Sequence, residues 1–134
     1  MKTVLLADDV DVLRAMLRDF LESLNVQVLE ASSAAAAVRA ARAHPGDIDV
    51  LLTDVELGRR SGWDCANEIA RNRPGIRVIY MSAALTESEW HGHAERHSDS
   101  FFIQKPFRME ELKTILLAIF GMDERNAMGD RFSL

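Results

Sequence analysis

The sequence predicts one α/β domain in which a five-stranded parallel sheet carries helices on both faces. Five short apolar segments rich in β-branched residues begin 23, 22, 28 and 25 residues apart, close to the ~30 residues that a strand, a turn and a helix require. Between these segments, apolar residues recur at helical spacing. The 134 residues leave room for one compact domain at ~100–200 residues per domain. This alternation favours a doubly wound sheet, because parallel strands need crossover connections.

The five predicted strands share a nearly continuous apolar character. The segments are residues 3–7, 26–29, 48–53, 76–81 and 101–103. The third and fourth lack the polar alternation that marks a half-exposed strand. We therefore expect helices to cover both faces of the sheet there.

The first helix is predicted from an apolar stripe that follows the first strand. The stripe consists of Val10, Leu13, Leu17 and Leu21, which step by three and four residues and so lie on one side of a helix. Asp9 precedes the stripe and is expected to cap this helix.

Two further helices follow the second and third strands. An alanine-rich helix opens at Ser32 and Ser33 and ends near His44, where a Pro-Gly pair stops it. Residues 63–71 form the next helix, and a second Pro-Gly pair ends that unit.

The remaining helices flank the fifth strand. Residues 86–95 are predicted to be helical, although a glycine and histidines dilute the apolar pattern. An apolar stripe from Met109 to Phe120 predicts the last helix, which we expect Gly121 to end. Residues 1–121 would then form the domain, and residues 122–134 a flexible C-terminal tail.

Composition excludes several classes of protein. Sixteen Lys and Arg against 21 Asp and Glu give a net charge of −5, without the basic run that direct binding of DNA or RNA requires. The longest apolar run, residues 115–120, is far shorter than the ~20 residues of a membrane span. No signal peptide is recognisable, so we expect a cytoplasmic protein without membrane insertion. The single cysteine, Cys65, is interpreted as a packing residue.

Polar and charged residues stand where four of the five strands end. Asp8 and Asp9 follow the first strand, Asp54 the third, Ser82 the fourth and Lys105 the fifth. Each residue has a structural explanation by itself, as a helix cap, a turn residue or a solvated charge. The carboxyl ends of parallel strands meet at one edge of the sheet, so these side chains are expected to form one site.

The charges of this site indicate a divalent cation. Two carboxylates ~5 Å apart repel by roughly 3 kcal/mol at an effective dielectric of ~20, and one lysine leaves three carboxylates with a negative surplus. Oxygen ligands with open positions suit Mg²⁺, and Mn²⁺ also fits. One carboxylate could then attack a phosphoryl group, while Mg²⁺ and Lys105 neutralise its oxygens and Ser82 donates a hydrogen bond.

Four motifs carry a resemblance to a known family. They are Leu-Leu-Ala-Asp-Asp at residues 5–9, Leu-Leu-Thr-Asp at 51–54, Met-Ser-Ala at 81–83 and Phe-Ile-Gln-Lys-Pro-Phe at 102–107. In this order they resemble the receiver domain of two-component response regulators, in particular single-domain, chemotaxis-regulator-like receivers. The match covers about residues 2–120 and implies a flavodoxin-like (βα)5 fold.

The resemblance implies a phosphoacceptor and a metal site. Asp54 would be the phosphoacceptor and a metal ligand. Asp9 would bind Mg²⁺ directly, Asp8 mainly through water, and the backbone carbonyl of Glu56 would complete the coordination.

It also implies a phosphoryl-binding set and a switch. Lys105 and Ser82 would contact the phosphoryl group, and Ser82 would move toward it. Phe102 would be the switch aromatic, and the bond between Lys105 and Pro106 would be cis.

By resemblance, the function is a phosphorylation-dependent signalling switch. A histidine kinase or a histidine phosphotransfer protein would donate the phosphoryl group from phosphohistidine to Asp54. The surface formed by residues 86–95, 101–103 and 109–120 would then signal to a downstream protein or mediate a homodimer. The domain would not be an enzyme beyond catalysing its own phosphoryl transfer and autodephosphorylation. It would lack a DNA-binding output domain.

One loop departs from the family pattern. Receivers commonly have Met-Pro in the third and fourth positions after the phosphoacceptor, where this chain has Leu57 and Gly58. Arg59 and Arg60 follow, while Gly62 keeps the family's spacing. We expect a more flexible loop with added positive charge near the site.

Other functions remain open at this stage. A haloacid-dehalogenase-like phosphatase would use Asp9 as the nucleophile and Asp11 as the acid/base. A receiver-like scaffold would bind a partner without being phosphorylated. A receiver excised from a hybrid histidine kinase would have the same motifs as a stand-alone regulator.

Several residues in or just after the predicted helix at residues 86–95 have two possible interpretations. His91, His93 and His97 could ligate a metal, or they could form a solvated polar face. Trp90 could contact a partner, or it could pack against its own helix. Trp63, at the start of the third helix, is expected to lie in the core.

Overall fold

A computed structural model of the chain describes residues 1–83, 88–89, 91–92 and 99–132. Its main feature in this part of the chain is a parallel sheet of five strands in the order β2-β1-β3-β6-β7. The strands are β1 (Thr3–Ala7), β2 (Gln27–Ala31), β3 (Val50–Asp54), β6 (Arg77–Ser82) and β7 (Phe101–Gln104). The predicted doubly wound α/β fold, flavodoxin-like in its strand order, is confirmed.

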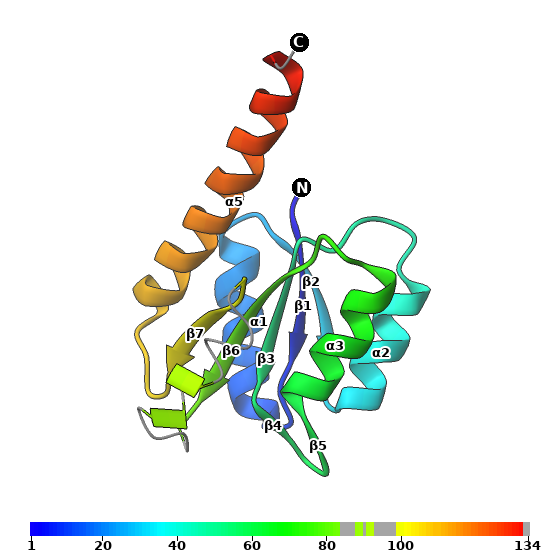
Figure 1. Ribbon diagram of the computed structural model, residues 1–134. Helices are drawn as coiled ribbons and strands as arrows, with labels where there is room; N and C mark the ends of the chain where they lie inside the picture. Colours follow the sequence, from blue (N-terminus) through cyan, green and yellow to red (C-terminus); the bar gives the residue numbers. More distant parts are fainter. Residues whose placement is uncertain (84–87, 90, 93–98, 133–134) are drawn as a thin grey trace.

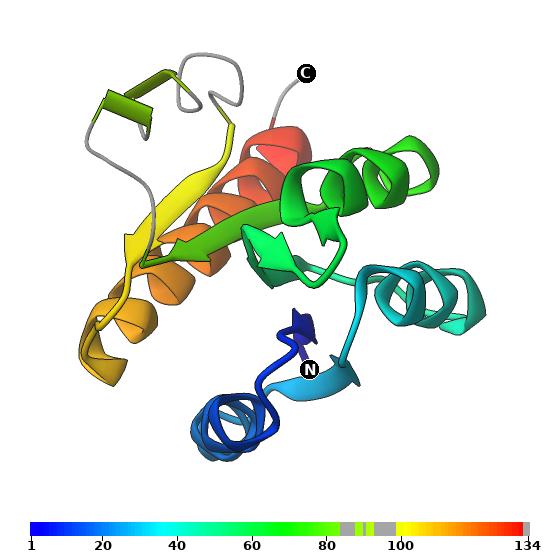
Figure 2. The same cartoon turned by 90° about the horizontal axis from the view of Figure 1, so that it is seen from below.

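Helices cover both faces of the sheet (Figures 1 and 2). On one face lie α1 (Asp11–Ser23) and α5 (Met109–Phe132), and on the other lie α2 (Ala34–Ala43) and α3 (Gly62–Asn72). Each face therefore buries its own hydrophobic cluster.

The central strands supply side chains to both clusters in alternation. Leu5 and Leu51 pack toward α2 and α3, while Leu6 and Leu52 pack toward α1 and α5, and all four are fully buried. This pattern explains why the strands read as continuous apolar runs, since both faces are covered.

The boundaries of β1 match the prediction, and those of the other four strands differ from it by one or two residues. Hydrogen-bonded pairing, rather than apolar character, sets where a strand begins: Val50 pairs with Val4 and Arg77, whereas Ile48 precedes the ladder. Ile48 is nevertheless buried in the core. Hydrophobicity therefore located these segments, while the register decided their ends.

The helix starts agree with the prediction at α2 and differ at α1. The Ser33 hydroxyl accepts a hydrogen bond from the amide of Ala36, as an N-cap does. The predicted capping of α1 by Asp9 is wrong, because the helix begins at Asp11 and its N-cap is Val10, with no side-chain cap. Val10 itself is 51% exposed rather than part of the apolar stripe.

The last helix continues beyond its predicted end. Helix α5 passes through Gly121 and reaches Phe132, so the expected stop at Gly121 is wrong. A glycine inside a helix costs only about 1 kcal/mol relative to alanine, and residues 122–128 contain mainly good helix formers. The division of the chain at residue 121 stays a prediction.

The described residues contain no helix that is both long enough and apolar enough to cross a membrane. The predicted helix at residues 86–95 lies largely outside the described residues; within it, residues 88–89 and 91–92 are helical. Trp90, His93 and His97 lie outside the described residues, and His91 is exposed.

Candidate phosphoryl and metal site

The polar residues at the strand ends meet in a cleft at the carboxyl edge of the sheet. The cleft has a volume of about 290 Å³, and the predicted site residues Asp9, Asp54, Ser82 and Lys105 line it. Parallel strand order brings these residues together, since all five strands end at this edge.

Lys105 joins two of the carboxylates. Its Nζ lies 2.6 Å from Oδ2 of Asp54 and 3.5 Å from Oδ2 of Asp8. Its backbone amide donates to the carbonyl of Ser82 at the end of the neighbouring strand, and the Lys105–Pro106 bond is cis. The ammonium group therefore lies between the two carboxylates, with its shorter contact to Asp54.

The carboxylates of Asp8, Asp9 and Asp54 form an acidic triad. One oxygen from each lies within 4.8 Å of the others. The side chain of Asp8 is fully buried, that of Asp54 is 13% exposed, and Asp9 is exposed. Three carboxylates beside one ammonium leave a negative surplus at short range, and all the donor atoms are oxygens. This donor set fits a hard divalent cation.

Burial raises the pKa of the Asp8 carboxyl group above its ordinary value of 3.8. The nearby Asp54 carboxylate acts in the same direction, while the amide of Val10 and the ammonium of Lys105 oppose the shift. A cation bound at the triad would relieve the cost of keeping Asp8 ionised.

Three aromatic rings pack against one another next to the strand that carries Ser82. Ser82 is 3% exposed at the end of β6, and Tyr80 stands two residues earlier on the same face of that strand. The ring of Tyr80 stacks on Phe102 at 5.5 Å between centroids and tilts against Trp63 at 4.0 Å. Burial raises the pKa of Tyr80 to about 12. Phe102 and Trp63 are half-buried against the core, as expected for Trp63.

The aromatic partner that sequence reasoning missed is Tyr80. It lies inside an apolar strand, where an aromatic residue is ordinary. Only the parallel register, which sets Tyr80 opposite Phe102, places it beside the predicted switch residue.

The loop after Asp54 is a tight hairpin. Strand β4 (Glu56–Leu57) pairs with β5 (Arg60–Ser61), and the turn has Gly58 at φ +66°. Positive φ at only the first of two central residues is the pattern of a type II′ turn, which favours glycine there. Leu57 is 3% exposed in the core and anchors the hairpin. The residues after Asp54 therefore form a two-stranded hairpin, and the flexibility expected from the missing proline stays a prediction.

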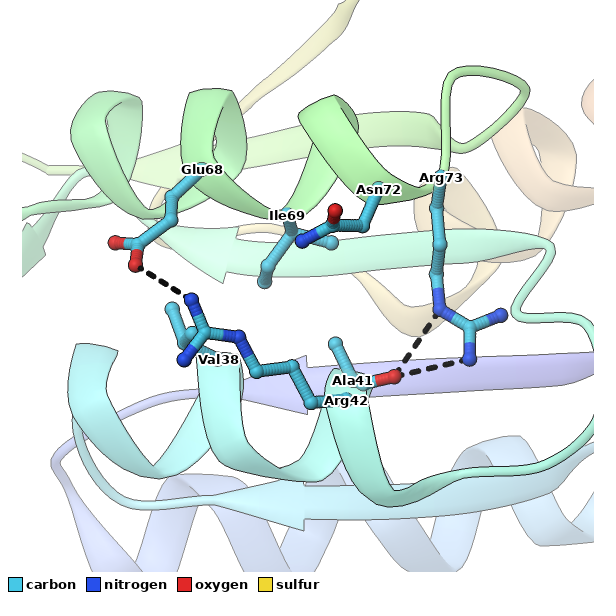
Figure 3. A pocket seen from close by; sticks show the side chains of 7 residues that line it. All are labelled: Val38, Ala41, Arg42, Glu68, Ile69, Asn72 and Arg73. Atoms are coloured by element: carbon cyan, nitrogen blue, oxygen red, sulfur yellow. Dashed lines mark hydrogen bonds and ion pairs between the residues drawn. The ribbon is translucent and has the colours of Figure 1, made fainter.

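Glu56 and Gly58 of this hairpin line the cleft. Arg60 is directed to α3 instead: its guanidinium donates to Glu68 at 2.8 Å, and Glu68 also accepts from Arg42 of α2 at 3.4 Å (Figure 3). These contacts lower the pKa of Glu68, chiefly through Arg60. One of the two extra arginines is thus paired away from the cleft, and Arg59 stays exposed.

Gly62 begins α3 in direct contact with the backbone of Asp54. Its amide donates to Val55 at 2.6 Å, and any Cβ at this position would overlap the carbonyl oxygen of Asp54. Only glycine therefore allows α3 to start this close to the site.

The arrangement does not support the phosphatase alternative. Its required acid/base, Asp11, is 83% exposed at the start of α1, pairs with Arg14, and is not among the residues that line the cleft. Asp54 and Lys105, which that alternative leaves without a role, form the shortest ion pair of the site.

Among the described residues, the triad is the one group of His, Cys, Asp or Glu that could hold a metal ion. The histidine alternative rests on residues that are mostly outside this part of the chain. Cys65 is fully buried, and burial raises the pKa of its thiol to about 11, so it is a packing residue as predicted.

Residues 4–117 match the family described as response regulator receiver domain. The chain belongs to this family. Among similar proteins, the DNA-binding transcriptional regulator NtrC of Azospirillum brasilense is 32% identical over 114 residues, which are 85% of this chain but 23% of that protein. The receiver thus spans less than a quarter of the length of this relative.

Solved structures resemble the receiver over most of its length. A response regulator receiver domain protein from Clostridium thermocellum has a TM-score of 0.78 at 23% identity, covering 96% of this chain and 98% of that one. The chemotaxis protein CheY4 of Vibrio cholerae has a TM-score of 0.78 at 19% identity, covering 89% and 98%. At these identities both structures bear on the fold alone.

Proposed function

We propose that this receiver domain is a phosphorylation-dependent signalling switch and that Asp54 is its phosphoacceptor. The observation that supports this most is the position of Asp54. Its carboxylate lines the open cleft, lies 2.6 Å from the ammonium of Lys105, and belongs to the acidic triad. A nucleophile, a cation and a metal-ligand set are therefore together where a phosphoryl group could enter.

In the proposed reaction, a carboxylate oxygen of Asp54 attacks the phosphorus of phosphohistidine in line. The new O–P bond forms as the P–N bond breaks, and the imidazole leaves. Lys105 then exchanges its contact with the free carboxylate for one with a phosphoryl oxygen. The Ser82 hydroxyl, at the end of the adjacent strand, donates a hydrogen bond to a second oxygen.

Mg²⁺ is the proposed metal, and Mn²⁺ would also fit. Asp9 and Asp54 would hold it directly, Asp8 mainly through water, and the Glu56 backbone carbonyl would complete the set. When bound, the metal would neutralise negative charge that develops on the phosphoryl oxygens. Hydrolysis of the acyl phosphate would return the receiver to its resting state.

The proposed switch runs from Ser82 to the aromatic rings. A shift of Ser82 toward the phosphoryl group would change the space beside Phe102, which already contacts Tyr80 and Trp63. Output would pass through the surface of residues 86–95, 101–103 and 109–120 to a downstream protein or a second copy of the chain.

The proposed donor is a histidine kinase or a histidine phosphotransfer protein in the cytoplasm. It must contact the receiver near the cleft. In the segment that follows Asp9, three large apolar side chains are exposed: Val10 before α1, and Val12 and Met16 in the first half of the helix, at 51%, 72% and 54%. Replacing Met16 with Glu should slow phosphotransfer from a phosphorylated histidine phosphotransfer protein and leave labelling by acetyl phosphate unchanged. Leu117→Glu, on the exposed face of α5, is the matched control.

The test of the switch is labelling with acetyl phosphate and Mg²⁺, followed by intact mass measurement. We expect one added phosphoryl group on the native chain, none on Asp54→Asn, and one on Asp49→Asn, whose aspartate lies at the opposite edge of the sheet. An unlabelled native chain, under conditions that label another receiver, would favour the scaffold alternative. Labelling that survives Asp54→Asn would reassign the phosphoacceptor.

A further inference from the structure

Arg14 of α1 contacts the backbone of the acidic site at Asp8. Its Nη1 donates to the backbone carbonyl of Asp8 at 2.9 Å. The same guanidinium pairs with Asp11 at 2.8 Å and with Glu30 of β2 at 3.4 Å. The side chain is only 17% exposed, so these contacts are partly shielded from water.

The contact falls on the segment that presents two carboxylates of the triad. Asp8 and Asp9 lie between the end of β1 and the start of α1, outside both elements. On one side, the amide of Asp8 donates to Ala31 of β2. On the other, the guanidinium of Arg14 donates to the carbonyl of Asp8. The two peptide units that flank Asp8 are therefore each held, one by β2 and the other by α1.

We propose that Arg14 is a positioning residue for the metal and phosphoryl site. Its guanidinium fixes the backbone at Asp8 and thereby the placement of the Asp8 and Asp9 carboxylates. The pairing with Glu30 and Asp11 holds the planar group in place and offsets its charge. This inference rests on the proposed function, because it assumes that the triad binds a divalent cation.

Positioning and long-range electrostatics predict opposite effects of losing Arg14. A cation near the site repels Mg²⁺, so its removal by itself would tighten Mg²⁺ binding. If Arg14 instead holds the ligands in place, its removal loosens them and weakens binding. The sign of the change therefore separates the two explanations.

The experiment is calorimetric titration of Mg²⁺ into the full chain. We expect Arg14→Gln to weaken binding about tenfold, as loss of outer ligand-orienting contacts does at other metal sites. Arg14→Lys keeps the charge but not the planar fork, and it should also bind Mg²⁺ more weakly. The matched control is Arg18→Gln: Arg18 lies on the same helix but pairs with Glu30 and Asp19 rather than with the backbone of Asp8. It should stay close to the native affinity.

A metal-free measurement keeps the test independent of Mg²⁺. Amide hydrogen exchange by NMR should be faster at Asp8 in Arg14→Gln, relative to Leu6 of the preceding strand β1, and unchanged in Arg18→Gln. In acetyl phosphate labelling, Arg14→Gln should raise the half-saturating Mg²⁺ concentration and leave the rate at saturating Mg²⁺ near native. A merely structural role would not raise the half-saturating Mg²⁺ concentration while leaving the saturated rate unchanged.

The outcomes divide clearly. Native or tighter Mg²⁺ binding by Arg14→Gln, or unchanged exchange at Asp8, overturns the role of Arg14. Should Arg14→Gln fail to fold by circular dichroism, Arg14→Lys carries the same comparison. A native chain that binds no Mg²⁺ contradicts the proposed function instead, and the exchange comparison at Asp8 still decides the role of Arg14.

Discussion

At the scale of single residues, the ion pair between Asp8 and Lys105 bears most directly on the stability of the site. The ammonium lies closer to Asp54 than to Asp8, although Asp8 is the fully buried carboxylate. Burial raises the pKa of Asp8, and the contact with Lys105 only partly opposes it. Ionising Asp8 in the metal-free fold therefore costs more free energy than ionising it in the unfolded chain, which is a common cost of a functional site.

This relation predicts a pH-dependent effect of Asp8→Asn in metal-free protein. A folded pKa above the unfolded one means that stability falls as the pH rises through the folded pKa. Asparagine avoids that loss, so the variant should be more stable than the native chain by roughly 1 kcal/mol at pH 7. The difference should vanish as the pH falls below 3.8, the ordinary pKa of the carboxyl group. Urea unfolding at several pH values measures it.

Asp9→Asn is the control, because it removes a neighbouring carboxylate of the same triad whose side chain is exposed. We expect a smaller change in stability from it at pH 7. An Asp8→Asn variant that is less stable than the native chain at pH 7 would contradict this prediction. It would mean that the contact with Lys105 fully offsets the cost of burying the Asp8 carboxylate.

Residue-scale features of the site were predictable to different degrees. Asp8, Asp9, Asp54, Ser82 and Lys105 are recognisable because strand order brings their positions to one edge. Tyr80 and Arg14 were not singled out, since an aromatic residue in a strand and an arginine in a helix are ordinary by themselves. Their contacts come from elements that are distant in the sequence.

At the scale of elements, the end of α2 is bound by a residue that directly follows α3. The guanidinium of Arg73, which follows α3, donates to the carbonyls of Ala41, His44 and Gly46 at distances from 2.8 to 3.2 Å. Figure 3 shows Arg73 reaching across to Ala41. Carbonyls at a helix end lack partners within the helix, and a cation suits the negative end of its dipole.

We predict that Arg73→Ala destabilises the fold by about 2 kcal/mol, as expected for the loss of hydrogen bonds to a charged donor. Arg73→Lys should recover only part of this, since a single ammonium cannot span three carbonyls. Urea unfolding gives the free energies. Labelling by acetyl phosphate should stay near native in both variants, because Arg73 lies near the amino edge of the sheet, away from the cleft. A loss of labelling in a folded variant would contradict this separation.

The element boundaries show which local signals were sufficient. Ser33 and the Pro-Gly pair after His44 delimit α2 correctly, because capping and helix breaking are local effects. Asp9 was assigned to a cap by the same local rule and instead lies in the acidic site. A carboxylate just before a helix could be either an N-cap or part of a metal site. Only the charged groups around it in the fold distinguish these two roles.

At the scale of the whole molecule, α5 is longer than the sheet that it covers. Figure 1 shows its C-terminal part rising past the edge of the sheet where β1 begins. Asp123 pairs with Arg77 at the start of β6, at 3.7 Å. Both side chains of this pair are partly exposed, so it adds little stability.

We predict that a chain ending at Gly121 still folds. Its stability should fall by less than about 1 kcal/mol, because the removed segment loses one identified surface ion pair. Circular dichroism should show fewer helical residues, and labelling by acetyl phosphate should persist. An unfolded truncated chain would show that residues 122–134 belong to the domain; Asp123→Asn in the full chain then isolates the contribution of the ion pair.

The sequence by itself determined the α/β class, the approximate position of the five strands, and the residues that meet at their carboxyl ends. These follow from hydrophobic periodicity and from the order of residues along the chain, which depend only on residues that are close in the sequence. Tertiary structure decided which strands are neighbours, how Lys105 divides its contacts between Asp54 and Asp8, and that a tight hairpin follows Asp54. It also decided that Arg14 holds the backbone at Asp8 and that α5 continues past Gly121. The physical reason is that hydrogen bonds, ion pairs and burial join residues far apart in the chain, and their balance exists only when the elements are packed together.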